Sequence, residues 1–415
     1  MSWILIISLL TLIALFIVFK AGDASSPWMV TTAVWLVILV MFQLSGHLLY
    51  PLGMRFYTCV AIWVPILCIT SMLTYYAFPA CKPEPAADEM PTNQLFFNFF
   101  FLISVVFTPL YIYEIYQVVS MFDAADMMYN LRILANSDYQ LRGQSVLKYI
   151  SAINQALFII GVWRYPRVSK PRFAFIVVAN ILCAVAIMEK GALFFMLVIT
   201  LFVLYQKRKV KLRNVAITVV IIFFLFYGFN FLRSGGDDEN ASTLLDFLSV
   251  YVLSPSVAFE QVQEKLTDQF GSRTLAFFYA VGQKLGFGHY AVEQKLQEFA
   301  YVPIPTNVYT VFQPFFEDFG YRGVAFFASV YGVFTGWLYR QCHNGNAISR
   351  CLYAYVLMTL VLQFYQENLI LSLSVLIQYL VIIALILQQS LSFHQSQSPV
   401  SSKRITSAPP PNSQL

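Results

Sequence analysis

The feature that most constrains this chain is a series of long apolar runs separated by short polar connectors. A helix rises about 1.5 Å per residue, so roughly twenty apolar residues cross the hydrocarbon core of a bilayer, which is about 30 Å thick. We therefore predict an all-α polytopic membrane protein with about 11 transmembrane helices and one large, partly helical periplasmic loop. The runs are 3–19, 28–46, 56–78, 95–117, 145–163, 173–189, 191–206, 214–232, 321–340, 350–370 and 372–392.

Charged residues are too scarce to cover a water-facing surface of this size. They make up 11% of the 415 residues, against 59% hydrophobic residues, and the mean hydropathy is +0.66. A soluble domain has about 25% charged residues. Apolar blocks of this length also differ from the alternating strands of an outer-membrane barrel. The composition excludes a disordered chain, a disulfide scaffold and a nucleic-acid-binding module, so we expect membrane lipids and no nucleic acid as partners.

Two short basic connectors orient the helices. Residues 164–172 and 207–213 together hold nine of the 26 Lys and Arg residues. Positively charged loops stay on the cytoplasmic side, so both connectors are predicted to be cytoplasmic. Counting spans from these anchors places the amino terminus and the connector 233–320 outside, and the carboxyl-terminal tail inside.

The charge pattern also divides the chain. Eleven of its 21 acidic residues fall between 233 and 320. We predict transmembrane helices 1–8 in 1–232, a large periplasmic loop or cap in 233–320, helices 9–11 in 321–392 and a disordered cytoplasmic tail in 393–415. A long loop without structure of its own is unusual, so the loop is expected to contain short helices. Its periodic runs are Thr243–Val252, Ser256–Phe270 and Thr274–Leu285.

The most specific motif lies where the large loop re-enters the membrane. The stretch PTNVYTVFQPFFEDFGYRG, residues 305–323, resembles the signature of the O-antigen and oligosaccharide repeat-unit polymerases, the Wzy-type proteins. Arg233, just beyond the span that enters the loop, is a further family-like feature. Lys190 departs from the pattern, because such proteins often have a Gly-x-Arg-like turn at this position. The matching signature positions are Pro305, Thr306, Asn307, Val308, Tyr309, Thr310, Phe315, Asp318, Phe319, Gly320 and Gly323.

The resemblance implies a GT-C-like glycosyltransferase of the bacterial inner membrane with its active site facing the periplasm. It would move a growing glycan from one undecaprenyl-diphosphate carrier to the non-reducing end of another carrier-linked repeat unit. Lipid-linked glycans are then its substrates, and a chain-length regulator protein is a possible partner. Diphosphate leaves readily, so the reaction needs positioning and electrostatic stabilisation, and no nucleotide or metal cofactor is expected.

Such a transfer needs cations to hold the diphosphate. Arg233, Arg322 and Lys190 are the candidates, because the predicted topology places each at the outer boundary of the membrane. Arginine binds phosphate oxygens bidentately. The alternative is that these side chains only reach toward lipid head groups, as basic residues at span ends often do.

A base must accept the proton of the attacking sugar hydroxyl. The candidates are Asp318 and Glu317 in the signature and His289 in the large loop. Asp318 is equally interpretable as a helix cap. His289 lies in a Gly-rich turn, and imidazole is the side chain most often used for proton transfer, although a lone loop histidine is often incidental.

Polar and aromatic residues near the signature are candidates for sugar binding. Asn307, Tyr309 and Tyr301 could hydrogen-bond to sugars or stack on them, and the alternative for the tyrosines is an interfacial aromatic belt. Two acids at outer span ends, Glu114 and Glu367, are weaker candidates for a functional role.

Two other functions remain open from the sequence. An O-antigen ligase would share the architecture and the donor, but would deliver the glycan to a lipid A core. A flippase or transporter of lipid-linked oligosaccharides would carry out no chemistry. The transporter predicts internal repeats and charges near mid-membrane, whereas this chain concentrates its polar residues in one outer loop.

Overall fold

The computed structural model describes residues 1–44, 48–80, 90, 92–120, 146–186, 190–207, 252–265, 269–290, 292 and 297–387, without the side chains of residues 146, 148 and 190. This part of the chain is mostly helical. The helices are α1 Ser2–Val18, α2 Pro27–Leu44, α3 Met54–Ala77, α4 Gln94–Val119, η2 Val146–Tyr149, α7 Ile150–Arg164, α8 Lys170–Ala186, α9 Lys190–Gln206, α12 Ser254–Phe259, α13 Ala276–Lys284, α14 Gln313–His343, α15 Ala347–Val361, η4 Leu362–Phe364 and α16 Leu373–Leu387.

Every predicted apolar run except 214–232, which lies outside the described residues, overlaps one of these helices. Among the described residues, α2, α3, α4 and the continuous stretch Ala347–Phe364 are long and apolar enough to cross a membrane. Four further apolar helices are shorter, namely α1, α7, α9 and α16. The chain is therefore a multi-pass membrane protein, and the count of about 11 spans stays a prediction.

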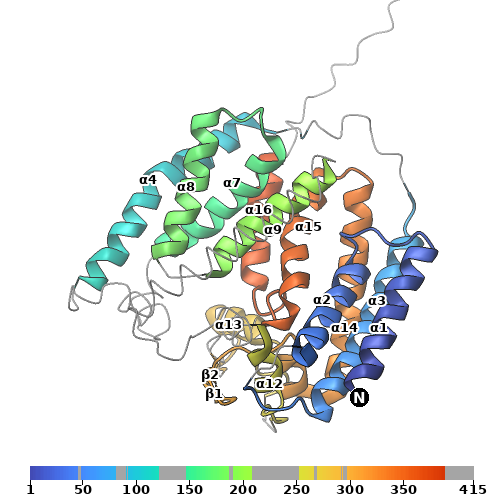
Figure 1. Ribbon diagram of the computed structural model, residues 1–415. Helices are drawn as coiled ribbons and strands as arrows, with labels where there is room; N and C mark the ends of the chain where they lie inside the picture. The colour runs from blue at the N-terminus through green and yellow to red at the C-terminus, as the bar shows by residue number, and fades with distance from the viewer. Residues whose placement is uncertain are drawn as a thin grey trace, which may run out of the picture.

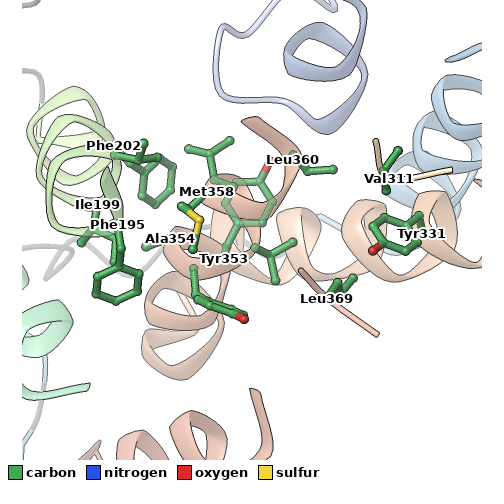
Figure 2. Packing of buried hydrophobic residues seen from close by; sticks show 14 of the residues in the cluster. Phe195, Ile199, Phe202, Val311, Tyr331, Tyr353, Ala354, Met358, Leu360 and Leu369 are labelled. Atoms are coloured by element: carbon green, nitrogen blue, oxygen red, sulfur yellow. The ribbon is translucent and has the colours of Figure 1, made fainter. Parts of the chain in front are cut away.

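The helices form two groups with a third set between them (Figure 1). In one group α1, α2, α3 and α14 pack side by side, and in the other α4, α7 and α8 pack together. Between them, α15 contacts α14 and α2 on one side and α9 and α16 on the other, while α16 and α9 also contact α7. Figure 2 shows the apolar packing at this junction, where Phe195, Ile199 and Phe202 of α9 face Tyr353, Ala354 and Met358 of α15.

The closest approach of two helices joins α3 to α14, the helix that carries the signature. A Cβ atom placed on Gly332 would lie 2.7 Å from the carbonyl oxygen of Leu67, and one on Gly336 would lie 2.3 Å from that of Ser71. Small residues four positions apart allow such close packing between helices in a membrane. The two glycines therefore fix α14 against α3.

The described part of the large loop is only partly helical. The predicted helix over Thr274–Leu285 is confirmed by α13, and α12 occupies the start of the predicted run 256–270. The prediction is wrong for residues 260–265, because the helix ends at Phe259 and the chain continues without regular structure through residue 265, while residues 266–268 lie outside the described part of the chain. A two-stranded antiparallel sheet, β1 Ala300–Tyr301 with β2 Pro305–Thr306, precedes α14. Of the predicted helix 243–252, all but the last residue lies outside the described residues.

The two ends of the helix bundle differ in what they carry. Met1 lies at the end where α12, β1 and β2 are found (Figure 1). At the opposite end, the α1–α2 connector meets the carboxyl ends of α9 and α14, through hydrogen bonds to Asp23 from Tyr205 at 2.9 Å and from Tyr339. The amino terminus and the large loop thus share one end of the bundle.

Candidate functional site

A kink in α14 lies within the signature. Gly320 interrupts the helix with φ 61° and ψ −152°, a conformation that glycine adopts without a Cβ penalty. A Cβ atom at Gly320 would lie 2.6 Å from a carboxylate oxygen of Glu264, and one at Gly323 would lie 2.3 Å from the carbonyl oxygen of Phe315. Both signature glycines are therefore required where the chain folds tightly on itself.

The kink lets residues 260–265 run along the first turns of α14. In a regular helix, the carbonyl of Glu317 would pair with the amide four residues later. Here it accepts a hydrogen bond from the Lys265 amide at 2.8 Å. This backbone contact brings the Lys265 side chain next to that of Glu317.

Glu317 is the centre of an ionic cluster. Its side chain is almost completely buried, with the residue 4% exposed, and its Oε1 lies 2.7 Å from Lys265 Nζ. Its Oε2 lies 2.8 Å from Arg273 Nε and accepts a hydrogen bond from Gln313 Nε2 at 3.1 Å. A buried carboxylate is tolerated only when it is paired in this way. The two cations are balanced by the carboxylates of Glu317 and Asp318, and Lys265 is the more exposed of the two cations.

Asp318 holds the loop that carries Arg273. Its carboxylate accepts hydrogen bonds from the Thr274 amide at 2.7 Å, the Arg273 amide at 3.3 Å and the Ser272 hydroxyl at 3.5 Å. The Thr274 hydroxyl in turn donates to the carbonyl of Pro314 at 3.0 Å. Asp318 therefore caps neither helix, because it lies within α14 and the N-cap residue of α13 is Leu275 with no side-chain cap, but it binds the turn before α13 and so positions the neighbouring arginine.

A second arginine, Arg55 in the first turn of α3, fixes residues 260–265 from the other side. Its Nη1 donates to the carbonyl of Glu260 at 2.5 Å and to that of Val262, and its guanidinium lies 5.2 Å from the ring centre of Phe316. These carbonyls would otherwise be free to continue α12. This explains why the predicted helix over 256–270 stops at Phe259.

The predicted sugar-binding residues lie at different depths. Tyr309 is buried, and its hydroxyl donates to the carbonyl of Glu298 at 3.0 Å. Burial raises the pKa of Tyr309, and the nearby Glu298 and Glu317 carboxylates raise it further. Asn307 is half-buried, whereas the Tyr301 side chain is exposed at the edge of the small sheet.

The remaining predicted residues are not joined to this cluster. His289 and Arg322 are exposed, and among the described residues neither forms a hydrogen bond or ion pair with Glu317 or Asp318. Lys190 begins α9, but its side chain is not described, and Arg233 lies outside the described residues.

Sequence reasoning missed Lys265, Arg273 and Arg55. The first two are among only five basic residues in the acidic loop 233–320, and their rarity there was the available signal. Arg55 stands directly before the apolar run 56–78, where it is indistinguishable from an ordinary basic residue at a span end. The sequence alone does not show that these three segments, which are distant along the chain, pack against one another.

Glu367 has a structural role. It is buried, and its carboxylate accepts hydrogen bonds from the Tyr331 hydroxyl and from the backbone amides of residues 369, 370 and 371. It thereby shapes the turn that precedes α16. Glu114 is half-buried near the end of α4. Within the described ranges, no group of three or more His, Cys, Asp or Glu residues could hold a metal ion.

Comparison with known proteins agrees with the resemblance of the signature. Over 259 residues the chain is 26% identical to a curated protein of Escherichia coli (strain K12) described as "Putative O-antigen polymerase". The match covers 60% of this chain and 62% of the relative's length. No protein-family model and no solved structure matches the chain. The similarity supports the resemblance to the Wzy-type O-antigen polymerases that residues 305–323 indicate.

Proposed function

We propose that this chain is a membrane glycosyltransferase that polymerises undecaprenyl-diphosphate-linked oligosaccharide repeat units into O-antigen or a related surface polysaccharide. We place the reaction at the periplasmic face of the bacterial inner membrane. The observation that carries the proposal is the cluster of Glu317, Arg273 and Lys265, which places two basic side chains against the polymerase-like signature. The similarity to the Escherichia coli relative supports the same class of activity.

In the proposed reaction, an acceptor sugar hydroxyl attacks the anomeric carbon of the donor glycan. The bond from that carbon to the diphosphate oxygen breaks, and the lipid diphosphate leaves with the bonding electrons. Lys265 stabilises the charge that develops on the diphosphate, while Glu317, paired with the buried Arg273, holds Lys265 in place. Preorganised groups of this kind contribute about 10²-fold to 10³-fold in rate. Arg322, Arg233 and Lys190 are proposed as outer cations that attract the substrate.

His289 is our choice for the group that accepts the hydroxyl proton. The carboxylates of Glu317 and Asp318 are each engaged by several donors. His289 is exposed and is not engaged by either. General-base catalysis contributes about 10²-fold to 10⁴-fold. Asn307, Tyr309 and Tyr301 are proposed to contact the sugars, and a chain-length regulator protein is a proposed partner.

Deleting the gene in its native host tests the function directly. A polymerase predicts that surface lipopolysaccharide then has a single repeat unit on the lipid core, and that the wild-type gene restores the long-chain ladder on a gel. Loss of all attached glycan, with polymer still present on the carrier lipid, would indicate a ligase instead. Repeat units trapped on the cytoplasmic face would indicate a flippase.

A further inference from the structure

The helix α13 presents an apolar face that no described part of the chain covers. None of its residues is buried. Phe278 is 56% exposed, Val281 39% and Leu285 66%, and Phe287 in the following turn is 75% exposed. Positions 278, 281 and 285 recur at the spacing of one helical face. Gln283 lies on the opposite face of the same helix.

The contacts that α13 makes with neighbouring segments hold it in this orientation. The start of α13 is anchored through Thr274, whose amide is bound by Asp318. The Tyr279 hydroxyl donates to the carbonyl of Phe270 at 2.5 Å, and the Tyr279 ring lies 5.0 Å from that of Tyr290. The segment that follows α13 therefore folds back so that Tyr290 packs beside Tyr279 and Gly282, while Phe278, Val281 and Leu285 stay exposed.

The length of α14 indicates how deep α13 lies relative to the lipid bilayer. Arg340, whose side chain binds the carbonyl of Phe78, marks the opposite end of the bundle. By subtraction, twenty residues separate it from Gly320, which corresponds to about 30 Å of helix and to the thickness of the hydrocarbon core. Gly320 and the adjacent Asp318 then lie at the level of the lipid head groups. Because Asp318 binds the turn that precedes α13, this helix begins at the same level.

The charges of this segment complement anionic lipids. Residues 269–290 contain Arg273, Lys284 and His289 and no Asp or Glu, although the loop 233–320 holds eleven acidic residues. Short amphipathic helices with aromatic residues on the apolar face and basic residues beside it bind in the plane of a membrane surface.

We propose that α13 and the turn after it are an interfacial anchor, with Phe278, Val281, Leu285 and Phe287 inserted into the outer leaflet of the bilayer and Lys284 beside anionic phospholipid head groups. The anchor would fix the depth of the turn that carries Arg273. The inference does not depend on the glycosyl-transfer activity.

Nitroxide labels at single introduced cysteines test the proposal. Phe278→Cys, Phe287→Cys and the opposite-face control Gln283→Cys are compared in the full-length protein, reconstituted into vesicles of phosphatidylethanolamine and phosphatidylglycerol. All variants carry Cys81→Ser, and the described native cysteines are buried, so they react poorly with the label. We expect the ratio of oxygen to nickel-chelate accessibility to be several-fold higher at positions 278 and 287 than at 283. Adding Lys284→Glu should lower this ratio in these vesicles, but not in phosphatidylcholine vesicles.

Two outcomes would overturn the proposal. Equal nickel accessibility at positions 278, 287 and 283 would mean that the apolar face lies in water. Labels at 278 and 287 that are immobile and shielded from both reagents would mean that protein, either another part of this chain or a second molecule, covers the face. Phe287 follows the helix, so its label reports even if a substitution within α13 disturbs the helix.

Discussion

At Glu317, the two cations that pair with the carboxylate differ in burial. The Arg273 side chain is 10% exposed, so it is committed to the buried carboxylate, whereas the Lys265 side chain is 45% exposed. Removing one partner of a buried ion pair costs about 3–5 kcal/mol, while an exposed pair contributes about 0–1 kcal/mol. The two cations should therefore respond differently to substitution, although both contact the same carboxylate.

We expect Lys265→Met to leave the protein folded and to lower polymerisation at least about tenfold, because it removes a cation that the diphosphate can reach. Arg273→Met should lower both the activity and the thermal midpoint, because Glu317 would keep only its half-exposed partner. Polymer length on gels and thermal unfolding in detergent measure the two effects. Lys170→Met, an exposed lysine at the other end of the bundle, is the matched control. Equal destabilisation by Lys265→Met and Arg273→Met would contradict the prediction that only the Arg273 substitution lowers the thermal midpoint.

Substitutions at Asp318 and His289 distinguish a positioning role from a role in proton transfer. Asparagine keeps one of the two acceptor oxygens that bind residues 272–274, so Asp318→Asn should keep more of the polymerising activity than Asp318→Ala, which should lower stability by about 1–3 kcal/mol. If Asp318 were the base, both variants would instead lose about 10²-fold or more. His289→Gln should cause that loss without a change in the thermal midpoint. Initial rates with a lipid-linked donor and acceptor, measured across pH, provide the readout.

Asp23, at the other end of the bundle, should make stability depend on acid pH. Burial alone raises the pKa of Asp23, but hydrogen bonds from His343, Tyr339, Ser25 and Tyr205 outweigh it and hold the pKa well below its usual range. A depressed folded-state pKa stabilises the protein above the unfolded value of about 3.9, and this stabilisation is lost as the pH falls toward the folded value.

The thermal midpoint of Asp23→Asn should therefore lie below that of the wild type by a constant amount from about pH 7 to about pH 5, and the gap should close below about pH 4. Differential scanning fluorimetry in detergent measures it. A gap that widened in acid would show that Asp23 does not have a lowered pKa in the folded state.

At the scale of elements, the contact between α3 and α14 determines where the signature lies. Gly336→Val would place methyl groups against the backbone of Ser71, whose carbonyl oxygen is already 2.3 Å from an added Cβ. Overpacking of this kind costs about 1–3 kcal/mol. We expect a lower thermal midpoint and a loss of polymerising activity, because Arg55 on α3 would no longer reach the carbonyls of residues 260 and 262. Val333→Leu, which adds volume on the exposed side of α14, should change neither.

At the scale of the whole molecule, the helix positions were predictable and the site was only partly so. Runs such as 56–78 and 95–117 have a length and an apolar content that locate a helix to within a few residues. The signature also pointed to Glu317 and Asp318. The partners Arg273, Lys265 and Arg55 could not be predicted, because their proximity depends on the kink at Gly320 and on backbone contacts between distant segments. The end of α12 was missed for the same reason, since Arg55 binds carbonyls that a local pattern treats as helical.

The two ends of the bundle also differ in charge. Near Asp23 the described basic residues have few acidic neighbours, whereas the signature end mixes both signs. The basic residues near the Asp23 end are Lys20, Arg164, Arg167, Lys170, Arg172, Lys207, Arg340 and Arg350. The signature end carries the basic residues Arg55, Lys265, Arg273, Lys284 and Arg322 with the acidic residues Glu260, Glu264, Glu298, Glu317 and Asp318.

Because basic loops remain cytoplasmic, this asymmetry predicts that the Asp23 end faces the cytoplasm and the signature end faces the periplasm, where lipid-linked repeat units would be joined. Gln263→Cys and Ser169→Cys, both exposed and at opposite ends, test this orientation in a background with Cys81→Ser. In cells with a permeabilised outer membrane, a membrane-impermeant maleimide should label Gln263→Cys at once, and Ser169→Cys only after the inner membrane is disrupted. The reverse pattern would place Glu317 and Arg273 in the cytoplasm, where a periplasmic polymerisation reaction could not use them.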